Sequence, residues 1–212
     1  MKKLALLLLP ILAITLMLGG NAVAQNVGDN SIYFVTYYSN ANTTGAPDGT
    51  LRLVNDGDKA TITDLWALIY VFDDSQEMRS CCACYTSADG LVSESVNKEL
   101  TANEFTGRGQ IARGVIKVIS SVSADPTDPV YAPGLRGWMT HIQATTTTFP
   151  APGPGYQVNA VEKGPWLVTE TALADSNLTA LEESNLGVLC SYGLTIGSGY
   201  GACPCTREDY DF

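Results

Sequence analysis

Six cysteines in two widely separated clusters constrain this fold more than any other feature of the sequence. The first cluster is Cys81, Cys82 and Cys84, and the second is Cys190, Cys203 and Cys205. A bond between adjacent Cys81 and Cys82 would be strained, and Cys203 and Cys205 are too close to pair comfortably. We therefore expect three disulfides that mainly join one cluster to the other, with the exact connectivity open. Such bridges close loops of roughly 110 to 120 residues and tie the end of the chain to its middle.

Two alternatives to structural disulfides use the same thiols. Four thiolates drawn from both clusters would suit a zinc ion, and the C-x-x-C from Cys81 to Cys84 has the spacing of a redox pair. The interval between the clusters is much longer than in zinc fingers, and no βαβ pattern surrounds the C-x-x-C. We therefore favour disulfides and predict neither a metal nor a cofactor.

The first 24 residues have the three-part layout of a secretory signal peptide. Lys2 and Lys3 precede an apolar run from Leu4 to Leu18, and Ala22-Val23-Ala24 is a small-x-small cleavage site before Gln25. The apolar run is shorter than the roughly 20 residues that span a bilayer, so we expect cleavage and no membrane span afterwards. Residues 25–212 are predicted to form a single domain that is secreted or periplasmic.

The charge of the chain argues against nucleic acid as a partner. The sequence has 12 basic and 22 acidic residues, a formal net charge of −10, and residues 1–24 hold two of the basic ones, which leaves −10 − 2 = −12. A polyanion needs clustered Lys and Arg, and the ten remaining basic residues are scattered among more than twice as many carboxylates.

A period of two dominates the hydrophobic pattern and predicts a mainly β chain. Leu51 and Leu53 fall on one face of a strand and Arg52 on the other, whereas Trp66–Phe72 is a continuous apolar run typical of a buried central strand. Turn residues and two Pro-rich stretches, Ser123–Gly137 and Thr145–Gly155, separate the strands as loops. We expect an antiparallel β-sandwich, immunoglobulin-like or related. The predicted strands are Ile32–Tyr38, Thr50–Val54, Trp66–Phe72, Leu91–Val96, Gly114–Ser123, Trp138–Gln143 and Leu167–Thr171.

One short helix is predicted near the C-terminus. Thr179 and Glu182 have capping-box spacing at its start, and Gly193 would end it. The helix would carry Cys190 on its last turn and begin a C-terminal strap, the segment from about Thr179 to Cys205 that the disulfides hold against the sandwich. Its apolar face is expected to hold Leu178, Leu181, Leu189 and Tyr192.

Few residues are candidates for chemistry. His141 is the only histidine, expected on the strand face opposite Trp138, Thr140 and Ile142, and no nucleophile or zinc motif accompanies it. Gly197–Gly201 lacks the spacing of a phosphate-binding loop. We therefore assign no catalytic residue and do not favour an enzyme. The chain ends in an aromatic-x-aromatic pattern, Tyr210 and Phe212, which we interpret as part of an acidic tail.

Three pairs of carboxylates occupy predicted turns, where Asp is favoured for its bonds to the backbone. The same oxygens would suit Ca²⁺, although no segment fits the twelve-residue EF-hand loop. The pairs are Asp56 with Asp58, Asp73 with Asp74, and Asp125 with Asp128.

Val71-Phe72-Asp73-Asp74-Ser75 leads toward Cys81-Cys82-Ala83-Cys84, and a Gly-rich segment leads into Cys203-Pro204-Cys205. With these features the chain resembles a group of uncharacterised exported bacterial proteins. The resemblance implies a bacterial cell surface or periplasm and a shared cysteine framework, and it implies no activity. We expect a structural or interaction module of the envelope or extracellular space, with a protein or surface polymer as partner. The alternatives are a module that binds Ca²⁺, carbohydrate or another small ligand, and an envelope hydrolase.

Overall fold

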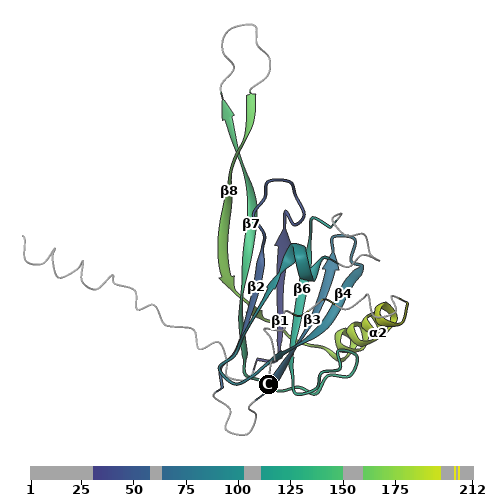
Figure 1. Ribbon diagram of the computed structural model, residues 1–212. Coiled ribbons are helices and arrows are strands. Elements are labelled where there is room, and N and C mark those ends of the chain that lie inside the picture. Colours follow the sequence, from purple (N-terminus) through teal and green to yellow (C-terminus); the bar gives the residue numbers. More distant parts are fainter. Residues whose placement is uncertain are drawn as a thin grey trace, which may run out of the picture.

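The computed structural model describes residues 31–57, 64–102, 111–149 and 160–196, together with Cys203 and Cys205. Their strands form two antiparallel sheets (Figure 1). The five-stranded sheet has the order β4 (Met78–Thr86), β3 (Leu65–Asp73), β6 (Arg113–Ser121), β1 (Tyr33–Ser39), β9 (Ala174–Asp175). The four-stranded sheet has the order β5 (Leu91–Ser95), β2 (Thr50–Asn55), β7 (Leu135–Phe149), β8 (Ala160–Ala172). The predicted antiparallel sandwich is therefore confirmed, and the predicted signal peptide lies outside the described residues.

The main core lies between the two sheets and follows the predicted alternation. In β2, Leu51 and Leu53 are fully buried in this core, whereas Arg52 points outward and pairs with Glu170 of β8. Burial of every second apolar side chain stabilises the contact between the sheets, because a β-strand presents alternate residues to opposite faces.

The central strand β3 is apolar throughout because it is covered on both faces. It pairs with β4 on one side and β6 on the other. Ile69 and Val71 point into the main core, and Leu68 and Tyr70 point into a second cluster on the outer face of the five-stranded sheet. The prediction of a buried central strand is confirmed, and its continuous apolar run follows from this double coverage.

The helix α2 (Ala180–Ile196) covers that second cluster beside β4 (Figure 1). Thr179 Oγ1 accepts a hydrogen bond from the Glu182 backbone N–H at 3.2 Å, as the capping prediction requires. The Glu182 carboxylate does not complete the capping box. It accepts a hydrogen bond from Tyr33 Oη at 3.1 Å and pairs with Lys117, so it fixes the helix start to the sheet.

Two details predicted for this helix are wrong. Leu181 and Tyr192 are 73% and 67% exposed, and the buried face instead contains Leu186 and Cys190. Gly193 does not end the helix, which continues to Ile196 and leaves Cys190 one turn before the end. A Cβ at Gly193 would meet nothing within 4 Å, so this glycine is an ordinary helical residue.

Three further segments differ from the prediction. The cysteine-rich segment forms β4, which the hydrophobic pattern did not predict, and residues 135–137 and 145–149 belong to β7 although they were expected to be loops. The threonines of β7 are β-branched and pair with β8, so the strand continues past the sandwich. The resulting β7–β8 hairpin projects beyond the other strands (Figure 1). A π-helical turn, η1 (Val96–Leu100), follows β5.

Candidate functional site

The three disulfides are the best-defined candidate site. They lie on the two opposite faces of β4. Cys81 points to the outer cluster beneath α2, whereas Cys82 and Cys84 point into the main core, because neighbouring residues of a strand alternate between its faces. The bonds are Cys81–Cys190, Cys82–Cys203 and Cys84–Cys205, with Cα separations of 5.8, 5.2 and 5.4 Å. The expected pairing of one cluster with the other is confirmed.

The outer disulfide fastens α2 to the five-stranded sheet. Cys81 and Cys190 are both buried in a cluster that includes Tyr33, Tyr70 and Leu186. Burial raises the pKa of both tyrosines above its usual range. Tyr70 Oη donates a hydrogen bond to the Pro126 carbonyl at 2.8 Å, so the polar end of this side chain is satisfied beneath the helix.

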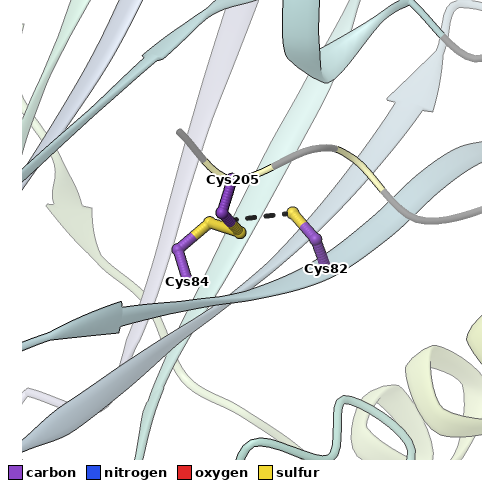
Figure 2. A group of neighbouring side chains, drawn as sticks. All are labelled: Cys82, Cys84 and Cys205. Carbon is purple, nitrogen blue, oxygen red and sulfur yellow. Dashed lines mark hydrogen bonds between the residues drawn. A yellow bond between two sulfur atoms is a disulfide. The ribbon is translucent and has the colours of Figure 1, made fainter. Parts of the chain in front are cut away.

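The two inner disulfides lie side by side in the main core. Cys82 and Cys203 are 121 residues apart in sequence, and so are Cys84 and Cys205, so two C-x-C segments face each other in the same register. The Sγ atoms of Cys82 and Cys84 are 4.0 Å apart, and the Sγ atoms of Cys82, Cys84 and Cys205 all lie within 4.8 Å of one another (Figure 2). Cys205 is the most accessible of the four.

A buried carboxylate that the sequence analysis missed lies beside these disulfides. Glu94 of β5 has no exposed surface, and its Oε1 is 3.8 Å from Cys84 Sγ. Glu94 takes part in at least one further interaction. The alternation of β5 could have indicated it, because Val92, Glu94 and Val96 share the inward face of that segment.

His141 lies at the side of the sandwich where β1 meets β7. Its ring stacks on Tyr37 with 4.1 Å between centroids, and its Nε2 is 2.7 Å from Thr171 Oγ1. The residue is 3% exposed, and its Nδ1 has no hydrogen-bond partner within the described ranges. Burial lowers the pKa of His141, and the backbone of Tyr37 partly opposes that shift. None of the contacts described for His141 is with a carboxylate.

The carboxylates predicted to lie in turns stabilise those turns. Asp73 accepts hydrogen bonds from the backbone N–H groups of Ser75 and Glu77 at 2.9 and 3.0 Å, and its other oxygen accepts one from Arg79 Nε at 2.7 Å. Burial raises the pKa of Asp73, but the hydrogen bonds and the charge of Arg79 outweigh it and hold that pKa below its usual range. Hydrogen bonds from Thr127 lower the pKa of Asp125 in the same way.

Asp56 and Asp74 take part in separate ion pairs. Asp74 pairs with Arg113 at 2.7 Å and Asp56 with Arg136 at 3.1 Å, whereas Asp58 lies outside the described residues. Within the part of the chain that the structure describes, the only group of three potential metal ligands with converging atoms is Cys82, Cys84 and Cys205.

Other sequence candidates are not covered by the structure. Gly197–Gly201, Tyr210 and Phe212 lie outside the described residues. None of the helices described has the length and continuous apolar character that a membrane span requires. Comparison of the chain with protein-family models, with curated proteins and with solved structures found no match.

Proposed function

We propose that this chain is an exported structural or interaction module of the cell envelope or the extracellular space. The observation that carries the proposal is the C-terminal strap, which three disulfides join to the single strand β4. Disulfides form and persist in oxidising compartments and are rare where thiols are kept reduced. A covalent framework of this kind suits a protein that must stay folded outside the cytoplasm.

Two exposed regions that include apolar side chains support a role in contact with a partner. Within the described residues, β8 has a strand neighbour on one side only, and its Leu167 and Val168 are 47% and 51% exposed. The edge of a sheet is a template for pairing with another chain. The outer side of α2 exposes Val188 and Tyr192, which line an open groove of about 720 Å³ beside residues 127–129. These surfaces suit a protein or a surface polymer as partner.

Export is tested by expressing the full chain in a bacterium and fractionating the cells. The expected product begins at Gln25, is found in the periplasm or the medium, and shows by intact mass the loss of one hydrogen pair for each of three disulfides. A variant that lacks residues 4–18 is the matched control and should stay in the cytoplasm with reduced thiols. An uncleaved, cytoplasmic wild-type chain would contradict the proposal.

The interaction role is tested with two exposed valines. Val168→Lys places a charge on the exposed β8 strand, and Val122→Lys is the matched control because Val122 is also exposed but lies on another strand end. We expect Val168→Lys alone to reduce retention of the purified protein on envelope material. Equal retention of both variants and the wild type would argue against β8 as the contact. A thermal shift with Ca²⁺ or sugars would favour a ligand-binding module, and turnover lost in His141→Ala would favour a hydrolase.

A further inference from the structure

The two inner disulfides bring four sulfur atoms to one part of the main core. We propose that Cys82, Cys84, Cys203 and Cys205, once both inner disulfides are reduced, form a four-coordinate site for a divalent thiophilic ion such as Zn²⁺. The chain would then have two ways to anchor its C-terminal strap, by disulfides or by a metal ion. This inference concerns binding chemistry that is independent of export or partner contact.

The spacing of the sulfur atoms fits a tetrathiolate. A tetrahedral zinc site with Zn–S distances of about 2.3 Å places its sulfurs about 3.8 Å apart. Cys82 and Cys84, which are not bonded to each other, already have their Sγ atoms 4.0 Å apart. Cys205 completes a triangle within 4.8 Å (Figure 2). Cys203, the fourth sulfur, is bonded to Cys82. On reduction the bonded pairs must separate, and Cys203 must move toward Cys84 and Cys205, because it lies outside the group of sulfurs within 4.8 Å of one another.

The topology selects these four cysteines and excludes the other two. The C-x-C spacing in β4 places Cys82 and Cys84 on the inward face, and the facing C-x-C supplies Cys203 and Cys205. Cys81 and Cys190 lie on the opposite face of the five-stranded sheet, beneath α2. The strand therefore separates four potential ligands from two thiols that cannot reach the same ion.

The burial and charge of the cluster indicate the kind of ion. Cys82, Cys84 and Cys203 are 5%, 0% and 4% exposed, and Cys205 is half-buried, so three of the four ligands would be buried, which suits a structural rather than a catalytic zinc site. Four thiolates carry four negative charges, and the Glu94 carboxylate lies 3.8 Å from Cys84 Sγ. The four negative charges of the thiolates favour a divalent over a monovalent ion.

The chemistry balances with a dithiol as reductant. Each inner disulfide takes up two electrons and two protons from one dithiol, which becomes a disulfide, and yields two cysteine thiols. The four thiols release four protons when they bind Zn²⁺, because thiolates are the ligands. The complex therefore carries a net charge of −2, and its formation is favoured at higher pH.

The first test counts the cysteines that the metal protects. The mature protein is reduced without oxygen by a phosphine, which adds no competing thiol, and is then alkylated with and without Zn²⁺ and analysed by peptide mass spectrometry. We expect Zn²⁺ to protect Cys82, Cys84, Cys203 and Cys205, while Cys81 and Cys190 react as fast as in the metal-free sample. Equal reaction of all six cysteines, or protection that includes Cys81 or Cys190, would overturn the proposal.

The second test distinguishes Zn²⁺ binding at a site formed by the folded protein from Zn²⁺ binding by an unfolded chain. The double variant Cys81→Ser, Cys190→Ser should bind one Zn²⁺ per chain after reduction, and Zn²⁺ should raise its melting temperature or restore its strand signal in circular dichroism. Cys84→Ser should lose both the stoichiometric uptake and the stabilisation. Uptake without any gain of folded structure, or equal uptake by Cys84→Ser, would contradict a site formed by the fold.

Discussion

Removal of the Cys84–Cys205 bridge is expected to cost little stability when the other bridges are present and much more when they are absent. The two cysteines are 121 residues apart, and in the chain-entropy model a loop of that size contributes about 5 kcal/mol to the free energy of unfolding at 25 °C. With Cys82–Cys203 intact, the same bond closes a ring of only about six residues. The model then gives about 2 kcal/mol.

The assay compares the same pair of substitutions in two backgrounds. Cys84→Ala with Cys205→Ala is made in the wild type and in a chain whose other four cysteines are alanine, and the free energy of unfolding is measured by urea denaturation. The cavity left by the two sulfurs is common to both comparisons, so the difference of about 3 kcal/mol reports loop closure alone. An osmolyte added to every sample keeps the bridge-free chain measurable if it is marginally stable.

The reasoning would be refuted by equal losses in the two backgrounds. Such a result would mean that the bridge acts mainly through contacts in the folded core and not through the unfolded chain. A loss of stability that is larger in the wild type than in the chain whose other four cysteines are alanine would refute the reasoning more strongly, because loop closure predicts the opposite order.

Three further predictions concern single residues. Burial lowers the pKa of His141 in the folded protein, so the unfolded chain binds a proton more readily. The stability is fully present above about pH 6.5 and falls as the pH drops below it, by at most about 1.4 kcal/mol per pH unit. His141→Phe should flatten this dependence, measured by urea denaturation at pH 7.5 and 5.5. Gly114→Ala places a Cβ 1.9 Å from the Phe72 carbonyl oxygen and should cost about 3 kcal/mol or more, whereas Gly193→Ala, in an open part of α2, should raise the melting temperature slightly. Tyr38→Phe removes a 2.9 Å hydrogen bond to that same carbonyl and should cost about 1 kcal/mol, measured by urea denaturation.

Each of these predictions has a contrary outcome. An unchanged pH profile in His141→Phe would show that another group titrates in this window. Similar stabilities for Gly114→Ala and Gly193→Ala would mean that the backbone near Gly114 shifts freely. A Tyr38→Phe variant as stable as the wild type would show that water or another donor replaces the lost hydroxyl.

The strands that the sequence predicted are those whose burial follows from aliphatic and aromatic side chains. β2 has one buried face and alternates, and β3 is covered on both faces and is continuously apolar. β4 was missed because its inward residues are small sulfur-bearing side chains, whose burial depends on disulfides to the distant C-terminal segment. The pairing of the two cysteine clusters was predictable, but the partners of each cysteine required the knowledge that Cys81 and Cys82 lie on opposite faces of a strand.

The buried face of α2 could not be predicted from the positions of its leucines. Leu181 and Leu189 suggested its apolar face, but the disulfide of Cys190 and the packing of Leu186 set its rotation on the sheet. The stacking of His141 on Tyr37 could not be predicted from the sequence either. Tyr37 belongs to the other sheet, and the two residues lie far apart in the chain. Contacts between sheets depend on how the sheets are layered, which no local pattern records.

The bond between Cys84 and Cys205 also determines how the chain bears a pulling force. A load applied beyond Cys205 reaches β4 directly through a covalent bond, and the pairing of β4 with β3 passes it on to the five-stranded sheet. The bond spans 121 residues, so it prevents the extension of about 400 Å of chain that a protein without the bond would release on unfolding. Under tension toward its C-terminal side, only the part of the chain before Cys84 can lengthen, so α2, β7 and β8 remain unloaded. The load path therefore runs from the C-terminal side through Cys205 and Cys84 into β4.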